Sequence, residues 1–128
     1  MNQVSGAIVD AAVHVHRQLG PGLLESVYLA VLAHELRKRG FRVQTEVAIP
    51  VRYESVVMEQ GFRADMIVED SVIVELKSVE ELARVHPKQL LTYLRLSDKK
   101  VGLLINFGSS LLKDGIIRMV NGLPESPA

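Results

Sequence analysis

Two short apolar segments joined by a polar tripeptide constrain the fold more than any other feature of the chain. Residues 62–68 and 72–77 each have the length of a buried strand, and Glu69-Asp70-Ser71 between them is a connection typical of a hairpin. The second segment begins with the apolar run Val72-Ile73-Val74, which indicates that both of its faces are covered. The chain is therefore expected to build a sheet with other elements packed on each side.

Three further stretches predict helices. Apolar residues recur at helical spacing in the first two stretches, and Gly20-Pro21-Gly22 ends the first because glycine accepts a left-handed cap and proline cannot continue a helix. Gly40 stops the second helix, and Pro87 suits the first position of the third. The expected helices cover residues 4–19, 23–39 and 87–97.

The remaining patterns predict strands. Alternation over residues 41–53 predicts a half-buried strand with its apolar side chains on one side and a bend at Pro50. The apolar run 101–107 predicts a strand buried on both faces, and residues 115–120 predict an edge strand. A short strand is expected at 56–58. The fold class that follows is α/β, with helices flanking a mixed central β-sheet.

Length and composition favour one domain. The chain has 128 residues, of which 48% are hydrophobic and 23% charged, as is typical of a chain that folds around a single core. We expect one domain over residues 1–121 and a flexible tail over 122–128. The chain contains no apolar run near the roughly 18 residues of a membrane helix, and its N-terminus does not resemble a signal peptide, so a cytoplasmic location is expected.

Charge and cysteine content narrow the kinds of site. Lys and Arg total 15, as do Asp and Glu, so no overall basic field would attract a polyanion at long range. The absence of cysteine excludes disulfides, thiolate zinc sites and a cysteine nucleophile. A bound metal would have to use oxygen or imidazole ligands.

Charged residues occupy positions in the hairpin where apolar ones belong. Glu75 and Lys77 lie two residues apart and point to the same face of the strand. With a three-residue connection, Asp65 faces Glu75, and Arg63 faces Lys77. A two-residue loop would instead place Asp65 opposite Leu76. Two facing carboxylates destabilise a sheet unless positive charge offsets them.

Two arrangements supply that positive charge. In the first, Lys77 and Arg63 neutralise the acids in a ladder of salt bridges. In the second, the carboxylates of Asp65 and Glu75, with the main-chain carbonyl of Leu76 between Glu75 and Lys77, bind Mg²⁺ or Mn²⁺, which prefer hard oxygen ligands. The residue spacing alone leaves both arrangements open.

Four motifs, in order, resemble one group of nucleases. Arg63-Ala64-Asp65, ten residues before Glu75-Leu76-Lys77, resembles the D…ExK signature of the restriction-endonuclease-like, or PD-(D/E)XK, nuclease superfamily. Gly22-Leu23-Leu24-Glu25-Ser26-Val27-Tyr28 is similar to the motif of the GxxExxY family within it, as is the preceding stretch 16–21. Gln89-Leu90-Leu91-Thr92-Tyr93 is similar to the QxxxY element of RecB-like nucleases.

This resemblance implies a restriction-endonuclease-like fold and a nuclease dependent on Mg²⁺ or Mn²⁺. Asp65 and Glu75 would bind the metal, and Lys77 would orient or help to deprotonate the attacking water. Glu25 would be an additional acid near the metal, acting as a ligand or through water. Gln89 would bond a phosphate or a catalytic side chain.

Some interpretations stay open beside that resemblance. Tyr93 shares a helix face with Gln89, but packing is an equally good explanation for it. Glu46 is placed near the site by its strand, but it is not assigned a role. DNA is the expected substrate, with RNA left open, and the small size of the chain suggests a homodimer. The alternative functions are a non-catalytic module that binds nucleic acid or a partner while retaining the nuclease fold, and a structural oligomerisation domain.

Overall fold

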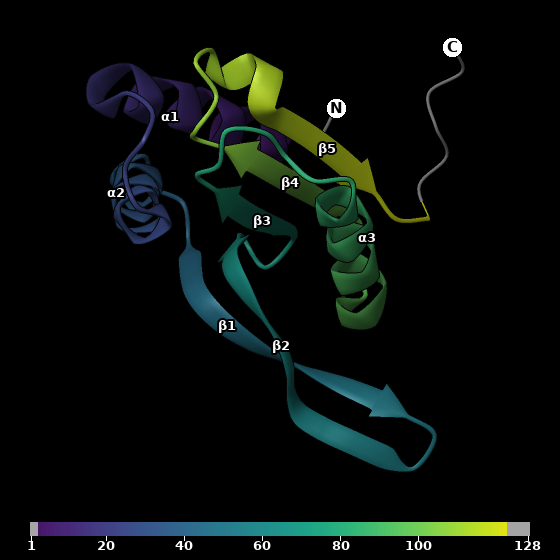
Figure 1. Ribbon diagram of the computed structural model, residues 1–128. Helices are drawn as coiled ribbons and strands as arrows, with labels where there is room; N and C mark the ends of the chain where they lie inside the picture. Colours follow the sequence, from purple (N-terminus) through teal and green to yellow (C-terminus); the bar gives the residue numbers. More distant parts are fainter. Residues whose placement is uncertain (1–2, 123–128) are drawn as a thin grey trace.

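The computed structural model describes residues 3–122 and consists of five strands, three α-helices and one 3₁₀ turn (Figure 1). The elements in chain order are α1 (Gln3–Leu19), α2 (Glu25–Lys38), β1 (Val43–Tyr53), β2 (Val56–Val68), β3 (Val72–Lys77), α3 (Val85–Ser97), β4 (Val101–Asn106), η1 (Leu112–Gly115) and β5 (Ile116–Val120). The predicted tail begins at Gly122, and its residues 123–128 lie outside the described part. None of the helices within residues 3–122 has the length and hydropathy needed to cross a membrane.

The five strands form one sheet in the order β1-β2-β3-β4-β5. Strands β3 and β4 are parallel, because α3 carries the chain back across the sheet between them, and the other neighbouring pairs are antiparallel. Helices α1 and α2 pack on one face and α3 on the other (Figure 1). The predicted α/β class and mixed sheet are therefore confirmed, and the arrangement agrees with the fold that the motifs imply.

The central strands are buried as the apolar runs predicted. All six residues of β4 and the first five of β3 are buried. Along β3, Val74 packs in the cluster formed with α1 and α2, whereas Ile73 packs in the cluster formed with α3. Because side chains alternate along a strand, Glu75 and Lys77 share the side of Ile73. The side chains of Glu75 and Lys77 are thus placed on the α3 side of the sheet.

The β2–β3 hairpin has the predicted three-residue connection. Its paired residues are Val68 with Val72, Ile67 with Ile73, and Met66 with Val74. Glu69 and Asp70 both adopt positive φ, which lets the chain reverse within so short a loop. The ladder ends at Met66 and Val74, so the predicted opposition of Arg63 and Lys77 is not part of it.

The prediction for the strands β1 and β2 was wrong in one respect. Residues 56–58 and 62–68 form one continuous strand, because a register shift opposite Pro50 absorbs the extra residues without ending the pairing. The predicted half-buried character of β1 is confirmed, because on its apolar side Ile49 is buried and Val43, Val47 and Val51 are partly buried. The distal halves of the two strands form an arm that extends beyond the other layers (Figure 1), so no helix covers it.

Candidate functional site

Two carboxylates meet where β2 separates from β3. The backbone N–H of Asp65 donates to Oε2 of Glu75 at 2.8 Å, and the backbone N–H of Leu76 donates to Oδ2 of Asp65, also at 2.8 Å. These reciprocal bonds lie directly beyond the Met66–Val74 pair and take the place of the next rungs of the ladder. Each carboxylate is therefore oriented by the backbone of the opposite strand.

The second oxygen of each carboxylate is free to bind something else. Oδ1 of Asp65 and Oε1 of Glu75 accept no hydrogen bond from the described residues. Neither oxygen is fully buried, because every fully buried side-chain oxygen in the described part of the chain has a hydrogen-bond partner. Neither acid forms an ion pair with any described basic side chain. The salt-bridge ladder of Lys77 and Arg63 is thus not what the structure contains.

Burial makes the negative charges of this pair costly. Desolvation, together with the nearby charge of Asp65, raises the pKa of Glu75 to about 8, against the lowering effect of the hydrogen bond from the Asp65 N–H. The pKa of Asp65 is also raised, chiefly by burial. Glu75 is only 8% exposed. A cation bound between the two carboxylates would offset this cost.

Two further charged side chains influence both acids of the pair. Lys77, at the end of β3, lowers the pKa values of both acids electrostatically, whereas Glu25 raises both. Glu25 lies in the first turn of α2 and lines a hollow of about 190 Å³ together with Asp65. The structure therefore brings Glu25 and Lys77 to the neighbourhood of Asp65 and Glu75, as the motifs suggested.

Glu46 is the neighbour that the sequence did not assign. It lines the same hollow, raises the pKa of Asp65 electrostatically, and stands between the pairs Thr45–Met66 and Val47–Ala64. Its φ of 52° is left-handed, a conformation that is costly for a residue other than glycine and is found disproportionately at functional sites. In the sequence, the only feature that could have pointed to Glu46 is that a charged residue stands within an alternating strand.

The donor set suits a hard divalent cation. Two carboxylates and the Leu76 carbonyl offer oxygen alone, as Mg²⁺ and Mn²⁺ prefer. Residues 3–122 contain no group of three or more His, Asp or Glu side chains arranged to hold a metal ion, so Glu25 and Glu46 do not complete a direct ligand set. Mg²⁺ commonly binds through one or two carboxylates and keeps several waters, which fits a site with two acid ligands.

Tyr93 and Gln89 differ in their relation to the acids. The Tyr93 ring stacks on Phe62 with centroids 3.9 Å apart. Burial raises the pKa of Tyr93, and the charges of Glu75 and Asp65 raise it further, which places its hydroxyl near them. Gln89 lies one turn earlier on α3, is exposed, and makes no side-chain hydrogen bond with the described residues. The structure thus brings Tyr93 to the acid pair, whereas Gln89 makes no hydrogen bond to either acid.

Tyr28, three residues after Glu25, explains how the loop before α2 is held. Its ring is fully buried and stacks on Phe107 with centroids 4.4 Å apart. Its hydroxyl donates to the carbonyl of Gly20 and accepts from the backbone N–H of Leu23. Tyr28 therefore fixes the turn between α1 and α2, and with it the direction from which Glu25 approaches the site.

Replacing Tyr28 with phenylalanine tests this structural role. The ring would keep its contact with Phe107, but the N–H of Leu23 and the carbonyl of Gly20 would lose their partner, at an expected cost of about 1–2 kcal/mol in the free energy of unfolding. Urea denaturation measures it. Tyr53→Phe is the matched control, because that side chain is 71% exposed and should change stability little. Equal effects of the two substitutions would contradict the role given to the Tyr28 hydroxyl.

Comparison with known families agrees with this geometry. A family model described as the PD-(D/E)XK nuclease superfamily matches residues 2–119. The chain belongs to this superfamily. No curated protein and no solved structure matches the chain. Members of the PD-(D/E)XK superfamily are generally nucleases that act on nucleic acid and typically use divalent metals. Asp65 and Glu75, the two acids of the pair, are the residues whose spacing resembles the D…ExK signature of this superfamily.

Proposed function

We propose that this protein is a nuclease dependent on Mg²⁺ or Mn²⁺ that hydrolyses phosphodiester bonds in DNA. The observation that carries the proposal is the acid pair, in which each carboxylate is fixed by a backbone N–H and keeps a free oxygen without a basic partner. Asp65 and Glu75 would hold the ion, together with the Leu76 carbonyl. When bound, a divalent ion lowers the pKa of a coordinated water and stabilises negative charge on the scissile phosphate.

The side chains around the pair have distinct proposed roles. Lys77 would hold and orient the attacking water, because its ammonium is within electrostatic reach of both acids. Glu25 would act on the ion through a water rather than as a direct ligand. Gln89 is exposed and would reach a phosphate of the substrate, whereas Tyr93 would line the site beside the acids. The fixed loop at Gly22 and Tyr28 supports assignment to the GxxExxY family as a further part of this proposal.

Two organisational features belong to the same proposal. Residues 1–121 would form a single nuclease-like domain, since one sheet runs from Val43 to Val120. A homodimer would give a 14.2 kDa chain more surface for its substrate, and the exposed apolar side chains of the β1–β2 arm support that association.

Calorimetric titration with Mn²⁺ tests the site before any substrate is chosen. The wild-type protein should bind the ion, and Asp65→Asn should bind it at least about 10-fold more weakly, because one charged ligand is lost while the side chain can still accept the Leu76 N–H bond. Asp114→Asn, an exposed acid on η1, is the matched control and should bind Mn²⁺ like the wild type. Equal affinity in all three proteins would remove the proposed metal centre and favour a binding module without turnover.

A further inference from the structure

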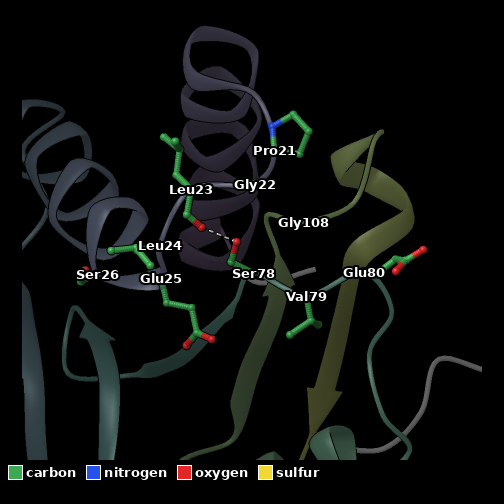
Figure 2. Close-up of a pocket in the computed structure, with 10 residues that line it drawn as sticks. All are labelled: Pro21, Gly22, Leu23, Leu24, Glu25, Ser26, Ser78, Val79, Glu80 and Gly108. Carbon is green, nitrogen blue, oxygen red and sulfur yellow. Dashed lines mark hydrogen bonds between the residues drawn. The ribbon is translucent and has the colours of Figure 1, made fainter.

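A second, larger hollow adjoins the acid pair. It measures about 720 Å³ and lies between the loop joining α1 to α2 and the segment that follows β3, as Figure 2 shows. This volume is in the range of about 300–1,000 Å³ of pockets for small ligands. The residues lining it are Pro21, Gly22, Leu23, Leu24, Glu25, Ser26, Ser78, Val79, Glu80 and Gly108. We call it the loop cleft.

The loop cleft is continuous with the acid site. Glu25 and Ser26 line both the loop cleft and the hollow that contains Asp65, and the Glu25 side chain points away from the loop toward the strands (Figure 2). On the opposite wall, Ser78 directly follows Lys77. A chain of nucleotides with one phosphate at the acid pair would therefore place a neighbouring group in the loop cleft.

The lining of the loop cleft offers no cationic side chain to a phosphate, and its chemistry fits a base. No Lys, Arg or His is among the described residues that line the loop cleft, whereas Glu25 and Glu80 are acidic. Leu24 is 74% exposed and Leu23 40% exposed, so apolar surface is available there. A nucleobase offers apolar faces to such surface and N–H donors at its edge to a carboxylate, as in the pairing of Glu or Asp with cytosine N4.

The walls of the loop cleft are fixed by hydrogen bonds. The Ser78 hydroxyl donates to the carbonyl of Leu23 and ties the two walls together (Figure 2). On one side, the buried Asn106 side chain accepts from the N–H groups of Val79 and Gly108 and donates to the carbonyl of Val79. On the other side, Tyr28 holds the loop at Leu23. The cavity is therefore formed before a ligand arrives, as is usual for binding pockets.

We propose that the loop cleft receives one unstacked base beside the phosphate held at Asp65 and Glu75. This inference rests on the proposed nuclease function and specifies its substrate class as single-stranded nucleic acid or unpaired ends. A base inside a continuous duplex is stacked and paired, and taking it out costs a few kcal/mol, whereas a single strand meets little of that cost. The protein therefore binds single strands in preference to duplex.

The variant Leu24→Asp tests the inference without endangering the fold. Leu24 is the N-cap residue of α2, with extended backbone angles and no side-chain cap, and aspartate is favoured at such a position. The substitution also places a third negative charge at the wall of the loop cleft, beside Glu25 and Glu80. Leu111→Asp is the matched control, because Leu111 is the N-cap residue of η1, is 53% exposed and does not line the loop cleft.

Fluorescence anisotropy in the Lys77→Ala background measures binding of a labelled DNA single strand and of a blunt duplex of the same sequence. We expect the single strand to bind at least about 10-fold more tightly, which corresponds to about 1.4 kcal/mol. Leu24→Asp should bring the ratio of single-strand affinity to duplex affinity close to one, and Leu111→Asp should leave that ratio unchanged. General repulsion by the added charge would weaken both complexes and preserve the ratio.

Three results would overturn the base-binding role of the loop cleft. They are duplex binding as tight as single-strand binding, an unchanged ratio in Leu24→Asp, and no binding of either DNA. The nuclease proposal is judged separately by Mn²⁺-dependent cutting in the otherwise wild-type protein. Equal cutting of the single strand and the duplex would support the nuclease proposal and refute the base-binding role of the loop cleft.

Discussion

Replacing Lys77 with alanine is expected to lower the rate of DNA cleavage in Mn²⁺ by about 10²–10⁴-fold, the usual contribution of a positioned acid or base. Lys77 is the basic side chain that the structure places beside both acids, and it is held at the end of β3, where its carbonyl accepts from the N–H of Phe107. Alanine keeps this backbone bond. Gel analysis of labelled single-stranded and duplex DNA measures the effect.

The control for Lys77→Ala is Lys113→Ala. Lys113 is an exposed lysine on η1, so the substitution removes the same charge away from the acids and should leave the cleavage rate unchanged. Both variants should unfold at nearly the wild-type urea concentration, because the half-buried Lys77 side chain makes no ion pair with a described residue. Cutting by Lys77→Ala at the wild-type rate would exclude the proposed role of this lysine.

The second large effect concerns pH in the absence of metal. The pKa of Glu75 rises from 4.5 to about 8 on folding, so the folded protein holds this proton more tightly than the unfolded chain. The stability that comes from it is present in full below pH 4.5 and is lost as the pH rises to about 8, with a slope of about 1.4 kcal/mol per pH unit for one group. The raised pKa of Asp65 acts in the same direction.

A bound divalent ion should reverse this trend. The ion competes with the proton for the carboxylates, so Mn²⁺ should stabilise the protein more at pH 8 than at pH 5. Urea denaturation at several pH values, with and without Mn²⁺, measures both effects. Other acids also titrate, so the comparison with Glu75→Gln isolates this one: the variant should have a flatter pH profile and a smaller gain from Mn²⁺. Identical profiles for wild type and variant would contradict the account of Glu75.

The hairpin and its acids could be predicted from sequence because local rules determine them. Glu69-Asp70-Ser71 sets the connection length, the connection length sets the register, and the register places Asp65 across from Glu75. The buried strand β4 was equally readable from its unbroken apolar run. These features depend on residues close together in the chain or on one strong pattern.

The features that sequence reasoning missed depend on contacts between distant segments. Glu46 reaches Asp65 only through the pairing of β1 with β2 and a left-handed backbone at Glu46 itself. The loop cleft needs three segments, around Leu23, Val79 and Gly108, that no local pattern connects. The exposure of the far end of the β1–β2 arm, at Tyr53, Val56 and Met58, was also missed, since alternation indicates an apolar side of a strand but not how far a covering layer extends.

The two ends of the β1–β2 hairpin are expected to differ in local stability. Near the acids, Thr45–Met66 and Val47–Ala64 are anchored to the core, whereas the far end around Glu54 is a two-stranded ribbon that supports only itself. Such ribbons are only marginally stable in water, so the tip can open and close while the rest of the molecule stays folded. Insertions, labels or protease cuts at the tip would consequently leave the carboxylates in place.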